Sequence, residues 1–512
     1  MADPLTSRLS WPTRIAYGAG IAPETWKSSG WDLFVLFYYT QVLGLPGTLT
    51  GAAIAAALAV DAVTDPLVGM WSDNLRRAPL GRRHTLMAAS ILPFAGAFAA
   101  LFMPPAGLGG FQLFLWLLCF AVITRIGITL WTIPFYAVGV ELSREPEERS
   151  RLIAIRTIGS NAARFSLTWA AFTFFFVASP QYPRGQLNPA AYPGFGLAIA
   201  LAATLVMVVT IAATRRPLQR IHDAESPAAY PRLPLGTVFR QFLPTIRLTP
   251  NIYIVIAVTL AVFAVLSTSN VLTLHLSTYY WQLEGPQIRD VQLAQVPGTI
   301  IAALLATRVI RRLDKKRTMI AGVAGFCACV LLPVLLPMLG ALPPPGTPEL
   351  ARALMAFQFL EGLTYGSFLV ATGATAADIA DEHEANTGRP QQGALPGITF
   401  FCTKASSAAI NLAVGVLLDL VRFPVGAKVA DVPQDKVAQL AVFTVVVVSS
   451  AALLLVWVIS RYDISADKQA RINERLRALR AGVGPGAPAA AGAATLPAAT
   501  APATAPGGSP AA

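Results

Sequence analysis

Apolar residues in this chain gather into runs of about 20 residues, which polar stretches separate. A helix of that length spans a bilayer core of roughly 30 Å and satisfies its own backbone hydrogen bonds there. The pattern therefore predicts an all-α membrane protein of about twelve transmembrane helices. The predicted spans are residues 24–44, 48–71, 85–104, 111–138, 153–178, 192–213, 251–281, 291–310, 319–340, 351–377, 397–421 and 438–460.

The spans fall into two groups of six. We expect an N-terminal six-helix bundle over residues 1–214, a central cytoplasmic loop over 215–250 and a C-terminal six-helix bundle over 251–460. Residues 461–512 are expected to be a cytoplasmic, largely disordered tail, because Ala481 to Ala512 is almost wholly Ala, Gly, Pro, Thr and Ser and has nothing to bury. Two such bundles favour a transporter with its binding site near mid-bilayer, between the halves.

Basic residues alternate between the connections. Lys and Arg accumulate on the cytoplasmic side of a membrane protein, so the alternation predicts that both termini are cytoplasmic. The expected location is the plasma membrane, which is the inner membrane in a bacterium. The residues that carry the pattern are Arg76, Arg77, Arg82, Arg83, Arg144, Arg149, Arg151, Arg215, Arg216, Arg220, Arg311, Arg312, Lys315, Lys316 and Arg317.

Composition narrows the class of protein. The chain is 54% hydrophobic and only 13% charged, whereas a soluble domain carries roughly a quarter charged residues. The net charge of +12 lies between the spans, so it indicates topology and not a nucleic-acid partner. No nucleophile with a His base, metal cluster or phosphate loop is apparent, which makes an enzyme or receptor the weaker reading. We expect no cofactor beyond a coupling Na⁺ or H⁺, and a monomer.

Two carboxylates lie four residues apart in the second span, at Asp61 and Asp65. A charge at the bilayer centre costs at least about 2.5 kcal/mol, so each one needs a reason. On one helical face the two would repel each other, unless one holds a proton or both share a cation. Oxygen ligands suit a hard cation, which predicts a site at Asp61 and Asp65 with Thr64. The alternative is that these acids pair with basic residues near a helix end.

The fourth span carries a polar stripe of Arg125, Thr129, Thr132 and Tyr136. Spacings of four, three and four residues place them on one face, which we expect to line a cavity. Thr129 would add an oxygen to the cation site. Arg125 needs a carboxylate partner, and we favour Asp32, with Glu361 second. A structural tether and a contact to the solute are equally open for Arg125.

Polar and aromatic residues also mark the first and eleventh spans. Lys27 and Trp31 share a face with Glu24, and an indole beside hydrogen-bonding groups suits a sugar ring. An interfacial Trp with a snorkelling Lys is the equal alternative. Lys404 stands in an otherwise apolar or small-residue span. It can pair with Asp61 or Asp65 when the cation is absent, which would couple ion occupancy to helix packing.

Several motifs resemble the glycoside-pentoside-hexuronide:cation symporters, the melibiose permease group of the major facilitator superfamily. The likeness covers most of residues 15–460. The motifs are Tyr17-Gly18-Ala19-Gly20, Tyr38-Tyr39-Thr40-Gln41-Val42-Leu43-Gly44, Asp61-Ala62-Val63-Thr64-Asp65-Pro66-Leu67-Val68-Gly69, Ser72-Asp73-Asn74 with Gly81-Arg82-Arg83, Ile133-Pro134-Phe135 with Glu141-Leu142-Ser143 and Glu148-Arg149-Ser150, and Asp378-Ile379 with Thr387-Gly388-Arg389 and Gly393.

The resemblance implies a rocker-switch fold and assigns roles. Asp61, Asp65 and Thr129 match the group's sodium-binding positions, Lys404 matches its coupling lysine, and Arg156 matches the arginine that opens the fifth span and serves the substrate. Thr25 and Thr132 stand where the galactoside permease has carboxylates, which argues against a galactoside.

The expected function is therefore cation symport of a small polar solute, a glycoside or other sugar, by alternating access. Lipid carriers of animals share the aspartate pair, so a sodium-coupled or proton-coupled lipid or drug carrier of the same fold is the alternative.

Overall fold

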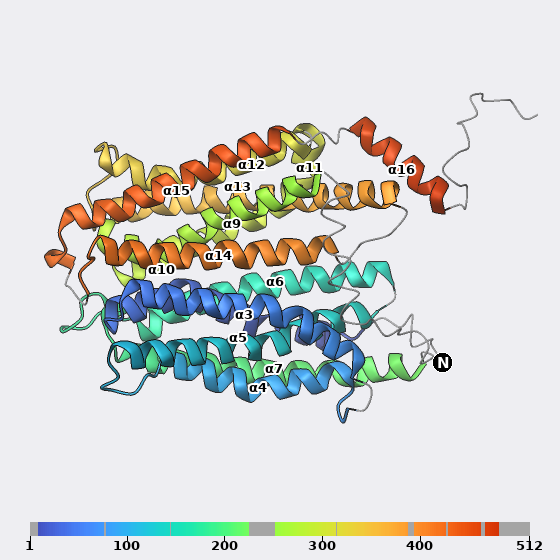
Figure 1. Ribbon diagram of the computed structural model, residues 1–512, viewed down its shortest axis with the longest axis horizontal. Helices are drawn as coiled ribbons and strands as arrows, with labels where there is room; N and C mark the ends of the chain where they lie inside the picture. Colours follow the sequence, from blue (N-terminus) through green and yellow to red (C-terminus); the bar gives the residue numbers. More distant parts are fainter. Residues whose placement is uncertain are drawn as a thin grey trace, which may run out of the picture.

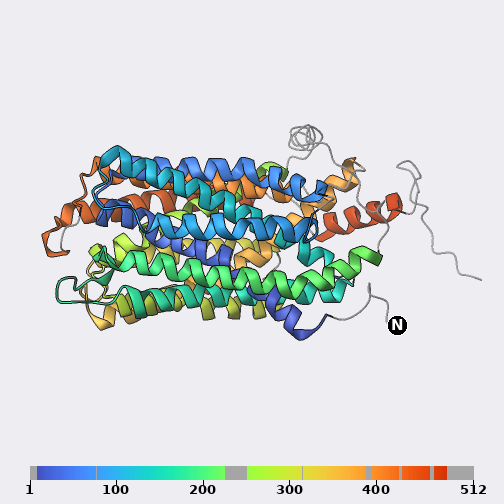
Figure 2. The same ribbon diagram turned by 90° about the horizontal axis from the view of Figure 1, so that it is seen from below.

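The computed structural model describes residues 9–75, 78–143, 145–224, 251–313, 315–387, 394–425, 429–461 and 466–480. Within these ranges the chain is helical and forms no strand, and most helices run along one common axis (Figures 1 and 2).

The N-terminal half begins with α1, and α2 continues through two π-helical turns, Trp31–Val35 and Tyr38–Val42. Its helices are α1 (Trp11–Ala19), α2 (Ala22–Gly30), α3 (Gly47–Asn74), α4 (Arg82–Leu101), α5 (Gly110–Glu141), α6 (Pro146–Ala170) and α7 (Ala191–Ala224). Those of the C-terminal half are α9 (Asn251–His275), α10 (Gly285–Leu293), α11 (Gln295–Leu313), α12 (Lys315–Met338), α13 (Pro348–Thr387), α14 (Ala394–Leu420), α15 (Gln434–Ser460) and α16 (Ala466–Arg480).

Each predicted span coincides with a helix, which confirms the all-α fold. Within the described residues, nine helices are long and apolar enough to cross a membrane. The predicted spans outside that set are 24–44, 153–178 and 291–310, which carry polar side chains facing the cavities described below, such as Lys27, Arg164 and Gln295. The three least apolar spans therefore contribute polar side chains to the cavities inside the molecule.

The described chain ends lie at the same end of the bundle (Figure 1). We call this the near end; it carries the α3–α4, α5–α6, α11–α12 and α13–α14 connections, and the opposite end is the far end. The described basic residues of the alternating pattern, such as Arg83, Arg149 and Lys315, lie at the near end. The alternation therefore reflects a real two-sided charge distribution.

The two halves pack against each other at the far end. Asp419, at the end of α14, accepts hydrogen bonds from the backbone N–H groups of Gly47 and Thr48, both at 2.7 Å. A carboxylate at a helix N-terminus satisfies otherwise unpaired N–H groups and interacts favourably with the helix dipole. Gln186 bonds Thr278 at 3.0 Å across the same interface. The far end is consequently closed.

Small residues bring α3 and α14 close together there. A Cβ atom on Gly415 would lie 2.1 Å from the backbone oxygen of Gly47, and one on Gly51 would lie 2.6 Å from that of Asn411. Any larger residue at Gly415 would collide with backbone atoms. Direct contact between the two halves here depends on glycine.

Ion pairs at the near end hold each half together separately. Arg14 binds Glu148 at 2.7 Å, and Arg83 binds Glu141 at 2.7 Å, both within the N-terminal half. Lys315 binds Asp378 at 2.7 Å within the C-terminal half. Between described residues, every near-end ion pair joins partners from one half. These ion pairs therefore stabilise each half by itself at this end.

Two segments differ from the sequence-based outline. Helix α7 continues to Ala224, ten residues into the segment expected as a loop, and residues 225–250 lie outside the described part. Helix α16 was not anticipated; its Ile472 and Leu476 pack on Ile252, Ile398 and Cys402. The disorder expected for Ala481 to Ala512 also falls outside the described residues.

Candidate functional site

A cavity of about 420 Å³ lies between the two halves. This is within the range of small-molecule binding sites, roughly 300 to 1,000 Å³. All the candidate residues singled out from sequence line it except Thr64 and Arg156. The lining candidates are Lys27, Trp31, Asp32, Asp61, Asp65, Arg125, Thr129, Thr132, Tyr136 and Lys404.

The two aspartates of α3 form one cluster with residues of α5 and α14. Thr129 lies 2.8 Å from Oδ1 of Asp61 and 2.9 Å from Oδ1 of Asp65. A hydroxyl has one proton, so Thr129 donates to only one of them at a time. Lys404 lies 2.9 Å from Asp61 Oδ2 and also binds Asp65. This ammonium ties the C-terminal half to the N-terminal half at mid-bundle, as expected from the sequence.

Arg125 has a different partner from the ones expected. The prediction that Asp32 or Glu361 would pair with it is wrong: Arg125 Nη1 donates to Asp61 Oδ2 at 3.2 Å. Its guanidinium also stacks over the Trp31 ring, 4.4 Å from the centroid. Sequence spacing placed Arg125 on the cavity stripe but could not tell how α3 and α5 pack. Two carboxylates thus face two basic side chains, and the cluster is close to electrically balanced.

Thr64 lies apart from this cluster. Its hydroxyl donates to the backbone oxygen of Asp61 at 3.3 Å, and it does not line the cavity. Among the oxygens proposed as cation ligands, the structure therefore brings together those of Asp61, Asp65 and Thr129 and leaves that of Thr64 outside.

The first span places a second charged group on the cavity wall. Lys27 binds Glu24 at 3.0 Å, and Thr132 lies 3.4 Å from the other Glu24 oxygen. Arg156 stacks on the Tyr136 ring at 4.6 Å, behind the cavity surface. Arg156 is therefore placed to orient Tyr136, which itself lines the cavity.

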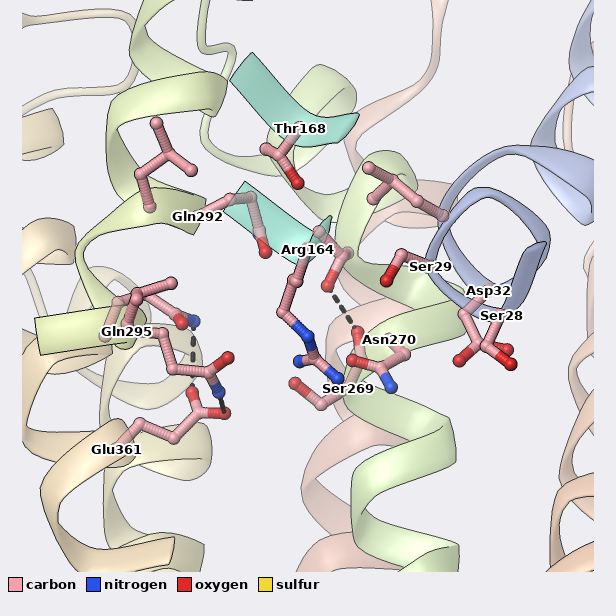
Figure 3. A pocket seen from close by; sticks show the side chains of 15 residues that line it. Ser28, Ser29, Asp32, Arg164, Thr168, Ser269, Asn270, Gln292, Gln295 and Glu361 are labelled. Carbon is pink, nitrogen blue, oxygen red and sulfur yellow. Dashed lines mark hydrogen bonds between the residues drawn. The ribbon is translucent and has the colours of Figure 1, made fainter. Parts of the chain in front are cut away.

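A smaller cavity of about 70 Å³ adjoins the main one and shares Ser28, Asp32, Arg164 and Asn270 with it (Figure 3). Sequence reasoning missed Arg164 as a site residue and considered Glu361 only as a partner for Arg125. A signal was present, since Arg164 is a charge in the middle of the fifth span and Asn270 follows three hydroxyl residues in the seventh. Neither belongs to a motif that carried the resemblance.

The fold and the site together define a class of protein. Two helical halves close at one end, a polar cavity lies between them, and ionisable groups at mid-bundle connect the halves. These are the features of a secondary transporter of the major facilitator type, and the molecule is a multi-pass membrane transporter, not an enzyme.

Comparison with known protein families assigns the chain to one family within this class. Residues 16–466 match the family described as "MFS/sugar transport protein", so the chain belongs to that family.

Relatives and solved structures are similar over different lengths. The putative glycoside/cation symporter YagG of Escherichia coli is 21% identical, over 96% of this chain and all of that protein. An uncharacterized symporter of Synechocystis is 29% identical, but the match covers 29% of this chain and only 28% of that relative. The crystal structure of the nucleoside transporter NupG has a TM-score of 0.57 at 12% identity, covering 88% of this chain and 99% of NupG. At that identity the likeness supports the fold.

Proposed function

We propose that the protein is a cation-coupled symporter that moves a glycoside across a bacterial inner membrane by alternating access. The observation that carries this proposal is the cluster of Asp61, Asp65 and Lys404, which joins the two halves directly beside a cavity of solute size. The similarity to a putative glycoside/cation symporter supports both the coupling and the solute class.

The cluster suggests how a cation would be coupled to movement. Asp61 and Asp65 are held by Lys404 and Arg125. A sodium ion or a proton arriving at the carboxylates competes with Lys404 for their charge, and so weakens the two ion pairs through which Lys404 joins α14 to α3. A cation thereby favours one arrangement of the halves over the other, which is the requirement for coupling.

The aromatic and polar lining of the cavity supports a sugar as the solute. Trp31 and Tyr136 contribute aromatic rings, each with an arginine stacked on one face, while Lys27, Asp32 and Thr132 offer hydrogen-bonding groups. Sugar rings present both an apolar face and hydroxyl groups, so this lining suits them. We expect Lys27, Trp31, Asp32, Arg125, Thr132 and Tyr136 to contact the solute and Arg156 to support Tyr136.

The alternative is a lipid or drug carrier, which the apolar residues of the cavity lining favour. These residues include Leu58, Ile128, Ile133, Phe263 and Phe400. A lysophospholipid added as competitor should leave glycoside uptake unchanged if the protein carries glycosides. Strong competition by the lipid would favour the alternative.

Orientation follows from the basic near end. We propose that the near end and both termini are cytoplasmic, which makes this structure inward-facing, and that the functional unit is a monomer. A reporter enzyme that works only outside the cytoplasm, fused after Arg480, should be inactive; high reporter activity would reverse the orientation.

The function is tested with purified protein in liposomes. A panel of radiolabelled glycosides is offered with a sodium gradient, a proton gradient or neither. At least one glycoside should accumulate above its outside concentration with only one type of gradient. Concentrative uptake by the Asp61→Asn, Asp65→Asn double variant would contradict the coupling site, and a lack of uptake of every glycoside would contradict the solute class.

A further inference from the structure

The smaller cavity, which we call the polar chamber, lies where the main cavity meets residues of both halves. Asp32 and Arg164 come from the N-terminal half, and Asn270, Gln292 and Glu361 come from the C-terminal half. Figure 3 shows Arg164 between Asp32 on one side and Glu361 on the other, with Asn270 and Gln292 close by. Any group in the chamber therefore faces both halves.

Arg164 differs from the other basic residues around the cavities. Lys27 is paired with Glu24, and Arg125 and Lys404 are paired with the aspartates. Arg164 is exposed to the cavity and makes no hydrogen bond or short ion pair with a described residue; its charge acts on Asp32 and Glu361 only through space. Its guanidinium has five donors available.

The two carboxylates of the chamber are also distinct from each other. Glu361 is buried, and its oxygens accept from Gln295 and Gln358, both at 3.0 Å. Asp32 makes no hydrogen bond to a described side chain and lines both cavities. Asp32 and Arg164 thus present a free acceptor and a free donor to the same space without closing on each other.

This combination selects the chemistry of a ligand. A guanidinium only donates, a carboxylate only accepts, and the amides of Asn270 and Gln292 do both. An alcohol group donates and accepts at one oxygen, so neighbouring hydroxyls can satisfy Asp32 and Arg164 together. A carboxylate or phosphate group could bind Arg164, but it would also face the carboxylate of Asp32, and like charges repel strongly where water is scarce.

We propose that Asp32 and Arg164 bind neighbouring hydroxyl groups of an uncharged sugar ring, and that the chamber rejects hexuronates. The proposal rests on the proposed function as a glycoside carrier and narrows the solute class to glycosides of uncharged sugars. Asp32 lies seven residues beyond Thr25 and Arg164 eight beyond Arg156, about two helical turns in each case. The sugar ring is therefore bound nearer to the far end than Thr25 and Arg156, the positions that the family resemblance links to the substrate.

Matched solutes test the proposal. Purified protein is titrated calorimetrically with the 4-nitrophenyl β-glycosides of glucose and galactose, and with the corresponding glucuronide and galacturonide, which differ only in the carboxylate. At least one neutral glycoside should bind about tenfold or more tightly than its uronide, because a like-charge contact costs several kcal/mol.

Variants then separate recognition from folding. Asp32→Asn should weaken binding of the neutral glycoside. It should also reduce the ratio of the neutral glycoside's affinity to the uronide's affinity, since the charge that repels the uronide is gone. Arg164→Gln should weaken both, by about tenfold or more. The controls are Asp435→Asn and Arg151→Gln, which remove an exposed charge outside the cavities and should bind as the parent protein does.

The outcomes are distinguishable. Tighter binding of the uronides, or equal losses for both solutes in Asp32→Asn, would overturn the inference while leaving a glycoside carrier in place. Binding of neither neutral glycosides nor uronides would instead contradict the proposed function, and the inference would fall with it.

Discussion

Two basic residues share one pair of carboxylates at the centre of the molecule. Arg125 is anchored on its own half by Trp31 and Asp61, whereas Lys404 reaches across from the other half. Breaking a buried pair by removing one partner typically costs 3–5 kcal/mol, because a charge is left unpaired. Removing any one of these charges should therefore leave a partner unpaired, but only Lys404 links the two halves through this cluster.

Asp65→Asn tests the coupling role of the cluster. The amide keeps the size of the side chain but removes one charge that attracts both Lys404 and the driving cation. Gradient-driven accumulation should vanish, while exchange of labelled for unlabelled solute across the membrane persists. Both rates are measured in liposomes, with Asp435→Asn as control. Accumulation at the parent level in Asp65→Asn would remove this carboxylate from the coupling site.

At the scale of helices, the far end is closed by contacts that leave no room for larger side chains. Gly47 and Gly51 of α3 meet Gly415 and Asn411 of α14 at backbone distance. Tyr279 also reaches Gln41 across the interface at 3.3 Å. Because alternating access requires this end to open, its packing sets the equilibrium between the state closed at the far end and the state open there.

Gly415→Leu should shift that balance toward a state open at the far end. A Cβ there would lie 2.1 Å from the Gly47 oxygen, so α3 and α14 can no longer pack this closely at the far end. A cysteine introduced at Ser29 should react faster with a membrane-impermeant thiol reagent applied on the far side. Gly96→Leu is the control, because nothing lies within 4 Å of its added Cβ. An unchanged labelling rate in Gly415→Leu would mean that this glycine contact does not hold the far end closed.

His275 lies in the same interface, fully buried between Phe37 and Phe423. Neither ring nitrogen makes a hydrogen bond of good geometry to a described residue, and its polar interaction is limited to the backbone of Val271. Leaving such a group unsatisfied costs about 1–3 kcal/mol.

His275→Phe should therefore stabilise this state and raise the midpoint of thermal unfolding by a few degrees. His84→Phe is the matched contrast, because His84 is buried but bonds Thr214 at 2.8 Å, and it should lower the midpoint. Unfolding is followed by the fluorescence of a thiol-reactive dye. A lower midpoint in His275→Phe would show that the imidazole has a stabilising partner.

For the whole molecule, the least expected element is α16. Ile472 and Leu476 cover the near-end starts of α9 and α14, and Lys468 binds Glu382 at 2.9 Å. The helix therefore belongs to the C-terminal half and should move with it. Its sequence is highly charged, so a search for apolar runs passes over it.

Two truncations separate this helix from the residues that follow it. Ending the chain after Arg480 should leave membrane abundance and transport unchanged, since Ala481 to Ala512 has nothing to bury. Ending it after Arg461 removes α16, exposes Ile252 and Ile398, and should reduce abundance by more than half. Abundance is measured by immunoblotting of membranes, and equal results for the two truncations would deny α16 a structural role.

Sequence alone was sufficient for features that depend on local pattern. Span number and position follow from apolar run length, because a bilayer requires about 20 apolar residues in each helix. The cavity stripe of Arg125, Thr129, Thr132 and Tyr136 follows from helical spacing, and the structure places all four on the cavity wall. These results need only one helix at a time.

Features that depend on two helices were decided by the tertiary structure. The choice of Asp61 over Asp32 as the partner of Arg125 depends on how α3 and α5 cross, and Arg164 became a site residue only because α6 faces α13 across the polar chamber. Periodicity specifies which face of a helix is polar but not which neighbour that face meets. Hydrogen bonds and short ion pairs require their atoms to lie within a few ångströms of each other, so residues distant in sequence acquire their chemical roles only when packing brings them together.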